Sequence, residues 1–349
     1  MNRKAFRLIY RLPRCFALCA SVLACSSPKG AELPKQEPST QEPGATETNV
    51  TMPSMLANGG TGEYDKTSTD TTVCQRGGTF CDGFETAAAA QPPQLPWSAV
   101  QTNGSVVVDS ARAFRGTQAV KATTLATAVS GATYKRALIG LSGAPVIPVE
   151  GNAFYGRMMF YLESAPQASL HWTFIDASGP IAGQNYSSTY RYGGQKPILD
   201  GSTFKGSQFM ANYDTNDFYG TPSRGPNTDC YKHADSTVVP VGKWSCAEWF
   251  FDGSNNQMKF WLDGTELTAI DIDGKGAGCT GADAKDVPDY PWTGPTISRI
   301  DMGWESYATD DERTIWIDDV VISPTQVGCP ARAAAPVSDT SNDTPTGRY

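Results

Sequence analysis

The stretch ASLHWTFIDASG, residues 168–179, holds one of only two histidines in the chain. Its residues alternate, so that Leu170, Trp172 and Phe174 fall on one face of an extended segment and His171 falls on the other. This alternation predicts a β-strand with one buried face. Burying large apolar side chains of this kind is worth roughly 1.5–3 kcal/mol each. The apolar face is therefore expected in a core, and His171 on the outer, polar face.

Short alternating runs of the same kind surround this strand. Among them are GRMMFYLES, KWSCAEWFFDG, QMKFWLDG, ISRIDMGWES and RTIWIDDVVIS, separated by Gly, Pro, Asn and Asp. Long helical patterns are absent from the sequence between these runs. Many short strands without helices predict an all-β sandwich or barrel. We favour a jelly-roll sandwich of two antiparallel sheets, one of them curved around a concave groove that His171 faces.

The N-terminus predicts export. Residues 1–24 combine Arg and Lys with the apolar run CFALCASVLA, which is too short for a membrane span and typical of a secretory signal. The sequence VLAC resembles the lipobox of bacterial lipoproteins, which implies cleavage before Cys25 and lipidation of its thiol. An ordinary signal peptide cut near Ala24 is the alternative. We expect a protein of the bacterial cell envelope, at the outer surface or in the periplasm, that touches the membrane only through its lipid.

Composition divides the remainder of the chain. Residues 25–73 are rich in Pro, Ser, Thr and Glu without a periodic apolar pattern, which predicts a disordered tether. Residues 331–349 form a similarly polar tail. Residues 74–330 are enough for one domain with a large core, which we expect to be monomeric.

The charge balance bears on the partner. The chain has 28 Lys and Arg against 36 Asp and Glu, a formal net charge of −8. Residues 1–24 hold five of the basic residues and none of the acidic ones, so the exported chain would carry about −13. Binding to nucleic acid needs a basic surface, so this class of partner is excluded. An acidic polysaccharide would need basic residues gathered at its binding site.

Six cysteines remain after the signal and Cys25: Cys74, Cys81, Cys230, Cys246, Cys279 and Cys329. An even number in an exported chain predicts disulfides. Six cysteines allow fifteen pairings. Neighbours in sequence suggest Cys74–Cys81 and Cys230–Cys246, which leaves Cys279–Cys329.

Seven motifs follow one another in a recognisable order. They are FCDGFE, GRMMFYL, HWTFIDASG, YRYGGQ, KWSCAEWFFDG with MKFWLDGTE, DMGWESY, and WIDDVVIS with GC. In this order the chain resembles the cellulose-induced-protein-like (Cip-like) core domains over residues 80–329. The resemblance implies a concanavalin-type jelly roll similar to that of glucuronan and alginate lyases, with a calcium ion at the edge of the sandwich.

The chemistry of a uronate lyase indicates the residue types to look for. The enzyme removes the proton at C5, beside a carboxylate, and expels the oxygen at C4, so it needs a base, an acid and a group that holds the carboxylate. We assign His171 as the base or a substrate ligand, Arg191 as a bidentate carboxylate ligand, and Tyr307 as the acid. Two other hypotheses stay open: a non-catalytic carbohydrate-binding protein that uses the same groove, and a purely structural surface protein.

Further polar and aromatic residues are predicted to bind the sugar. Arg157 is a second candidate for the carboxylate, although it could instead pair with Glu248 on a neighbouring strand. We interpret His233 as an incidental loop residue. The predicted substrate-binding set is Arg157, Tyr190, Tyr192, Gln195, Asn212, Glu248 and Trp304.

A calcium site is predicted from the late strand WIDDVVI. Its two neighbouring acids, Asp318 and Asp319, fall on opposite faces, so one points inward or to the sandwich edge. An inward acid needs a partner, and hard oxygen ligands suit Ca²⁺. We predict a structural calcium held by Glu85, Asp318 and loop oxygens near Ser110. The alternative is a hydrogen-bonded acid without metal.

Overall fold

The computed structural model describes residues 63–66, 71–126, 134–215, 226, 228–276, 278–281, 284–285 and 287–332. The predicted signal peptide, the lipid site at Cys25 and most of the predicted tether lie outside these ranges. Within them the helices are short: α1 is Thr71–Cys74, and two 3₁₀ helices span Glu150–Asn152 and Thr268–Ile270. No helix in the described ranges is both long and apolar enough to cross a bilayer.

One sheet, which we call the β6 sheet, has nine strands. Its order is β14-β13-β12-β6-β19-β4-β3, with β1 paired to β19 and β15 paired to β13, and its pairs are antiparallel. The strands are β1 Phe80–Asp82, β3 Gly104–Asp109, β4 Ala119–Thr124, β6 Ala153–Leu162, β12 Trp244–Asp252, β13 Gln257–Leu262, β14 Thr265–Glu266, β15 Ile272–Asp273 and β19 Arg313–Ser323.

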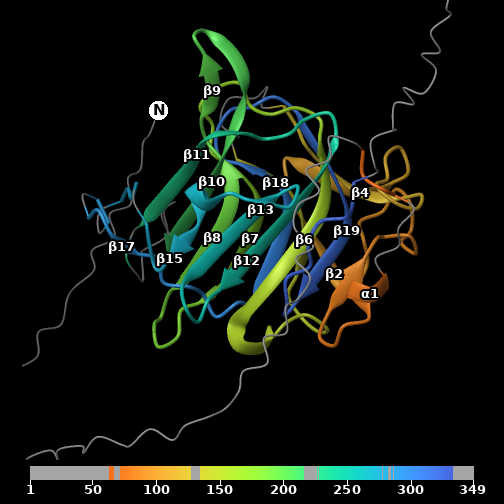
Figure 1. Cartoon of the computed structure of the whole chain (residues 1–349), viewed down its shortest axis with the longest axis horizontal. Helices are drawn as coiled ribbons and strands as arrows, with labels where there is room; N and C mark the ends of the chain where they lie inside the picture. Colours follow the sequence, from red (N-terminus) through yellow and green to blue (C-terminus); the bar gives the residue numbers. More distant parts are fainter. Residues whose placement is uncertain are drawn as a thin grey trace, which may run out of the picture. The chain divides into compact units, whose positions relative to one another are not determined.

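The other large sheet, which we call the β7 sheet, has eight strands. Its order is β11-β10-β8-β7-β18-β5-β2, with β9 paired to β10, and its pairs are again antiparallel. The β9–β10 hairpin projects from the sandwich at the top of Figure 1. The strands are β2 Trp97–Thr102, β5 Lys135–Leu141, β7 Trp172–Pro180, β8 Ser187–Gly194, β9 Pro197–Asp200, β10 Thr203–Thr215, β11 Asp229–Val238 and β18 Arg299–Ser306, while β16 Lys275–Gly276 and β17 Tyr290–Pro291 form a separate pair.

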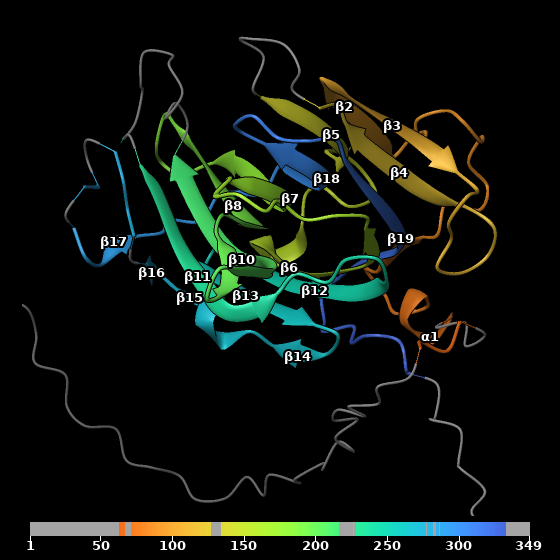
Figure 2. The same cartoon turned by 90° about the horizontal axis from the view of Figure 1, so that it is seen from above.

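The two sheets stack as layers, which Figure 2 shows from above. Apolar side chains from both inner faces form one core: Phe160 and Phe260 of the β6 sheet contact Phe174 of the β7 sheet at ring-centroid distances of 5.6 and 6.1 Å. The predicted all-β jelly-roll sandwich with two antiparallel sheets is confirmed.

Strand β7, which contains most of the stretch HWTFIDASG, lies in the middle of its sheet between β8 and β18. Leu170, Trp172 and Phe174 are all buried, and the Trp172 ring stacks on Trp304 at 4.6 Å. The predicted inner face of this strand is therefore correct. His171 lies one residue before the first strand residue.

A bulge interrupts the alternation in β7. The register with both neighbouring strands shifts between Thr173 and Ile175, so that Phe174 and Ile175 are both buried in the core. An extra residue of this kind reverses which later residues face outward. Asp176 consequently faces the same side as Thr173.

The folded part extends beyond the predicted bounds of residues 74–330. Tyr64 and Arg332 form a β-bridge, and the Tyr64 hydroxyl donates a hydrogen bond to Asp263 Oδ1 at 2.5 Å. Arg332 makes an ion pair with the same carboxylate at 2.8 Å, and Val73 is buried. Parts of the predicted tether and tail therefore pack on the domain, because an aromatic ring and an arginine find partners there.

Three disulfides are formed, but only one of the suggested pairings is correct. Cys74–Cys81 is confirmed. The others are Cys230–Cys279 and Cys246–Cys329 rather than Cys230–Cys246 and Cys279–Cys329. The suggested pairing fails because Cys230 is buried in the main core, whereas Cys246 packs in a separate cluster with Phe114 and Met159.

Candidate functional site

Polar side chains on the outer face of the β7 sheet lie in rows that cross the strands. In one row Asp301, Asp176, Arg191 and Asn212 are successive register partners on β18, β7, β8 and β10. Side chains directly opposite one another on one face are close enough to interact. We call this surface the polar face, and its members are Arg136, His171, Thr173, Asp176, Arg191, Asn212, Asp214, Arg299, Asp301, Glu305 and Tyr307.

His171 is half-buried at the edge of this face. Its ring lies 4.7 Å from the ring of Tyr307, and its carbonyl accepts a hydrogen bond from the Tyr307 N–H at 3.3 Å. Its Nε2 is buried and has no hydrogen-bond partner among the described residues. Burial, and then the charge of Arg191, lowers the pKa of His171 to about 3. The imidazole is therefore neutral at ordinary pH, with Nε2 free to accept or donate.

Tyr307 is held by two polar neighbours. Its hydroxyl donates to Glu305 Oε2 at 2.7 Å and lies 3.3 Å from the Thr173 hydroxyl. Glu305 Oε1 also accepts hydrogen bonds from the Tyr134 hydroxyl and from Arg136 Nε, the latter at 3.1 Å. Burial raises the pKa of Tyr307 well above its usual value. The phenol is thus fixed in position and stays protonated.

Arg191 is already paired. Its Nη1 donates to Asp214 in a short ion pair and to Asn212 Oδ1 at 3.3 Å, while its Nε is buried without a partner among the described residues. Burial opposes the charge on Arg191, but Asp214, Tyr307, Glu305 and Asp176 together outweigh it, and the pKa of Arg191 is raised. Asn212 in turn donates to Asp229 Oδ1 at 2.5 Å. A substrate carboxylate at Arg191 would use the edge formed by Nε and Nη2, which the contact of Nη1 with Asp214 leaves unused.

The second histidine belongs to the same sheet. His233 is on β11, not in a loop as the sequence suggested, and its Nε2 is 3.1 Å from Gln195 Oε1. The proximity of His233 also lowers the pKa of His171. The predicted Gln195 and Asn212 therefore lie near the polar face. The alternation of DCYKHADSTV could have placed His233 on a strand.

Several site residues escaped the sequence prediction. Asp176, Asp214 and Asp301 lie on the polar face with raised pKa values, which burial causes first in each case. Arg299 donates two hydrogen bonds of 2.6 Å to the Asp301 carboxylate. Only the register between distant strands brings these groups together, so no local motif marks them.

Three predicted sugar ligands are wrong because they point into the core. Tyr190 and Tyr192 flank Arg191 on one strand, so alternation turns them inward when Arg191 faces out. The Tyr190 hydroxyl donates to the Trp292 carbonyl at 2.9 Å, and Tyr192 stacks on Phe251 at 5.5 Å. Trp304 is likewise fully buried against Trp172.

Arg157 and Glu248 lie away from the polar face, because they are on the β6 sheet. They are register partners on β6 and β12, as the alternative interpretation required. Glu248 Oε1 accepts hydrogen bonds from the backbone N–H groups of Val327 and Gly328 at 2.8 and 2.9 Å, and Arg157 Nη1 donates to the Gly328 carbonyl at 3.2 Å. Both side chains fasten the C-terminal segment.

The predicted calcium ligands use their carboxylates on other donors. Asp318 is buried and accepts the N–H groups of Phe114, Arg115 and Asp319 at 2.7–3.1 Å. Burial and Asp319 raise the pKa of Asp318 to about 7. No group of three His, Cys, Asp or Glu side chains in the described part of the chain has the arrangement of a metal site.

The other two members of the predicted calcium set are exposed or bonded elsewhere. Glu85 accepts the N–H and hydroxyl of Thr117 at 2.9–3.0 Å and the N–H of Gln118 at 3.1 Å. Ser110 is exposed. These contacts fit the hydrogen-bonded alternative, and calcium stays a prediction.

Two hollows lie outside the polar face. One, of about 350 Å³, is lined by Phe80, Val146, Phe154 and Ile322 among others. The other, of about 380 Å³, surrounds Pro96 and reaches Ser98, whose hydroxyl accepts a hydrogen bond from Arg299 at the margin of the polar face.

Comparison with known proteins gives one extended family match. A family model described as "Polysacc_lyase-like: Cip1-like, core domain" matches residues 83–325. Among solved structures, "Cellulose induced protein, Cip1" aligns at a TM-score of 0.46 and 23% identity, over 72% of this chain and 99% of that one. Alginate lyase Aly36B aligns at 0.41 and 11% identity over the same shares. No curated protein matches.

Proposed function

The chain belongs to the Cip1-like core-domain family of polysaccharide-lyase-like proteins, and from this premise we propose that its polar face binds an acidic polysaccharide and cleaves it by β-elimination. The family match confirms the resemblance drawn from the seven motifs. Membership supports a polysaccharide-active protein, and the lyase chemistry and its residues are our proposal.

The juxtaposition of His171 and Tyr307 carries this proposal. Their rings lie 4.7 Å apart, and burial biases their protonation in opposite ways. The imidazole is neutral because its pKa is lowered, and the phenol is protonated because its pKa is raised. A base must be deprotonated and an acid protonated before the reaction begins. Both groups are in the required state over the ordinary pH range.

The reaction follows from these two groups. Once the side chains over it move aside for the substrate, the buried Nε2 of His171 accepts the proton from C5 of the uronate, and the electrons form the C4–C5 double bond. The C4–O bond breaks, and the Tyr307 hydroxyl protonates the leaving oxygen. Return of the proton from His171 to Tyr307 through solvent restores the site. A uronate carboxylate beside the ring would raise the pKa of His171 and so strengthen it as a base.

Arg191 is the proposed ligand of the uronate carboxylate. Charge builds up on this carboxylate as C5 loses its proton, so a cation there stabilises the transition state. The unpartnered Nε and its neighbour Nη2 form the forked edge for this contact, since Nη1 donates to Asp214. A lysine places a point charge at the same position but cannot make the forked contact.

Incubation with glucuronan and with alginate tests the proposal, because only elimination produces the ultraviolet absorbance of an unsaturated uronate. We expect product with the full chain and a loss of roughly 10-fold or more with Arg191→Lys. Unsaturated product from neither polymer would contradict the lyase proposal.

A non-catalytic sugar-binding protein is the second candidate, and the pairing of Arg191 with Asp214 favours it. The arginines of the polar face are engaged by carboxylates: Arg299 by Asp301, Arg136 by Glu305 and Arg191 by Asp214. A binding surface tolerates such pairing, whereas a lyase must redirect part of it to substrate. Calorimetric binding of oligosaccharides without any product would support this candidate.

We also propose the anchor inferred from the sequence: lipidation at Cys25, with the domain displayed at the cell envelope. Mass spectrometry of the N-terminal peptide from a bacterial membrane fraction tests it. Cys25→Ala should release the protein into the soluble fraction, and retention in the membrane would contradict the anchor.

A further inference from the structure

Asp176 is a polar-face group that the proposed chemistry leaves without a role. The residue is only 7% exposed, although it lies on the outer side of a central strand. It has no hydrogen bond or ion pair with any residue that the structure describes. Its carboxyl oxygens are not fully buried. The part of Asp176 that reaches the surface is therefore its carboxyl group.

The neighbours of Asp176 in its row already have partners of their own. Asp176 is the register partner of Arg191 on one side and of Asp301 on the other. Arg191 is engaged by Asp214, and Asp301 by Arg299. A buried carboxyl without a partner is costly, so a ligand that completes its hydrogen bonding would offset this cost.

The charges facing Asp176 favour its protonated form. Asp301 and Glu305 approach from β18, Arg191 from β8 and Arg136 from β5. Burial first, and then the two carboxylates, raises the pKa of Asp176 well above its usual value, against the smaller effect of the two arginines. A protonated carboxyl offers one O–H donor as well as an acceptor.

We propose that Asp176 determines specificity for acidic sugars: in the row between Arg191 and Asp301, its O–H donates a hydrogen bond to the uronate carboxylate that Arg191 binds. This inference rests on the proposed function, since it names the substrate group that the polar face recognises. Hydrogen bonds from O–H to a carboxylate are short and strong. A neutral sugar offers no charged acceptor at this position and gains less.

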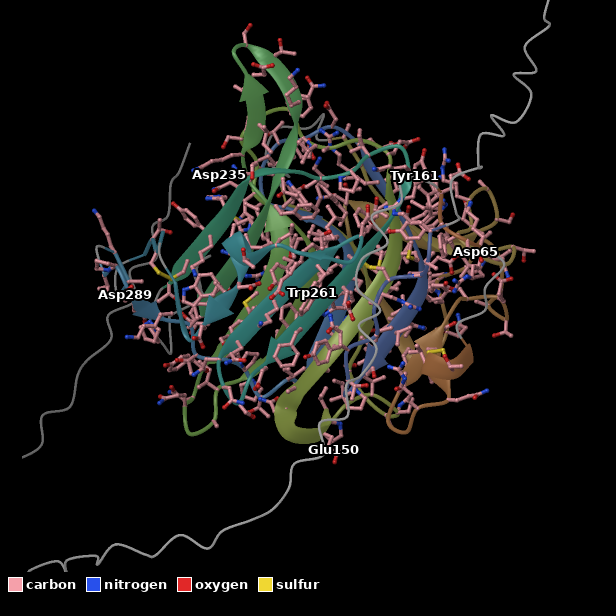
Figure 3. The ribbon with its side chains drawn as sticks, in the orientation of Figure 1. Asp65, Glu150, Tyr161, Asp235, Trp261 and Asp289 are labelled. Atoms are coloured by element: carbon pink, nitrogen blue, oxygen red, sulfur yellow. A yellow bond between two sulfur atoms is a disulfide. The ribbon has the colours of Figure 1, made fainter. Side chains whose placement is uncertain are left out.

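Binding affinity tests the inference without requiring turnover. Oligoglucuronate and oligoalginate are titrated into the full chain and into Asp176→Asn and Asp176→Ala by calorimetry at about pH 5 and at rising pH up to the limit at which the full chain stays folded. The amide of Asp176→Asn keeps a donor of nearly the same shape without a titrating proton. Glu150→Gln is the matched control, because Glu150 is exposed beside the start of β6 in the other sheet, at the bottom of Figure 3.

We expect Asp176→Ala to weaken binding roughly 10- to 100-fold at the lower pH, which corresponds to the loss of one hydrogen bond to a charged group. At the lower pH, the affinity of Asp176→Asn should stay within about threefold of that of the native chain. At the higher pH the native chain should bind more weakly, because Asp176 loses its proton, whereas the affinity of Asp176→Asn should not change. Glu150→Gln should follow the native chain at both. Melting curves of each variant establish that it is folded.

Two results would overturn the inference about Asp176 while leaving the proposed function intact. Equal weakening by Asp176→Asn and Asp176→Ala would mean that Asp176 acts as an ionised acceptor, and undiminished binding by Asp176→Ala would mean that it touches no ligand. If the native chain binds neutral oligosaccharides and no acidic ones, or binds neither, the proposed function fails and the inference fails with it.

Discussion

The outer faces of the two sheets both carry charged side chains, but they use them differently. On the β6 sheet, Arg157 and Glu248 bind the backbone of Val327 and Gly328, and the Cys246–Cys329 disulfide fastens the same segment. On the β7 sheet, the polar face pairs side chain with side chain. Buried atoms without a partner in the described part of the chain occur on both sheets, Nε2 of His171 and Nε of Arg191 on one and Nε1 of Trp316 on the other, so the faces differ in the kind of pairing.

This difference separates a structural face from a candidate site. The backbone N–H groups that donate to Glu248 are fixed in position, and their hydrogen bonds stabilise the folded state. Side-chain pairs such as Arg191–Asp214 can exchange partners when a ligand arrives. The partners of the aromatic rings also differ between the two sheets. Trp261 of the β6 sheet, at the centre of the side facing the viewer in Figure 3, lies beside another aromatic ring, Tyr155, at 6.2 Å. Tyr307, on the polar face, instead contacts the titratable ring of His171.

The largest effect is expected at Tyr307. Replacing Tyr307 by Phe keeps the ring beside His171 but removes the acid, so turnover on the cleaved polymer should fall roughly 10²- to 10⁴-fold. Initial rates of unsaturated product measure this. Glu248→Gln, which keeps the acceptor oxygen on the other sheet, is the control and should not change the rate. An active Tyr307→Phe would remove Tyr307 from the mechanism.

The opposite face should respond in stability instead. Glu248→Ala leaves the N–H groups of Val327 and Gly328 without their acceptor, which should lower the free energy of unfolding by roughly 1–3 kcal/mol. Denaturant unfolding measures the change, and the rate per folded molecule should stay constant. Loss of turnover at unchanged stability would place the active face on the β6 sheet.

A smaller effect is expected from Asp229, beside the polar face. Burial raises the pKa of Asp229 to about 6, while the hydrogen bond from Asn212 opposes the shift. The folded state therefore holds a proton that the unfolded state has lost, and stability falls as pH rises from about 4 to about 6.

Asp229→Asn keeps an acceptor for Asn212 and does not titrate. Above about pH 6 it should be more stable than the native chain by on the order of 1–2 kcal/mol, and the difference should vanish towards about pH 4. Thermal unfolding across this range measures the difference. A constant difference at every pH would mean that the pKa of Asp229 is the same in the folded and unfolded states.

The smallest effect is expected from calcium. An ion held by Glu85, Asp318 and oxygens near Ser110 would have to share carboxylates that already accept backbone N–H groups. We expect added Ca²⁺ to raise the melting temperature with concentration, because it binds only the folded state. If neither Ca²⁺ nor EDTA changes the melting temperature and elemental analysis finds no metal, the calcium prediction is wrong, and the acids are held by hydrogen bonds alone.

Much of the fold could be predicted from alternation, because a residue's face is a local property. The inner face of β7 and the outward position of His171 follow from neighbours in sequence. The same rule, applied to Tyr190 and Tyr192, would have excluded them once Arg191 was placed outside. The bulge that turns Asp176 outward has no local signal in FIDASG.

The remainder of the site depends on the register between strands, including the distant pair β7 and β18. Asp176, Arg191 and Asp301 meet because β7 pairs with β8 and β18, and no spacing within one motif encodes this. The disulfides illustrate the same limit, since Cys246 joins Cys329 across 83 residues. The covering of Arg157 and Glu248 by the C-terminal segment is likewise a tertiary feature.

The rate of unsaturated-uronate formation by His171→Ala, compared with its stability, tests the central claim most directly. The claim is that the polar face of the β7 sheet performs the chemistry while the core side of the same strand holds the fold. We predict a fall in rate of roughly 10²-fold or more, with the free energy of unfolding changed by less than about 1 kcal/mol. An unfolded His171→Ala, or one that keeps the native rate, would contradict it.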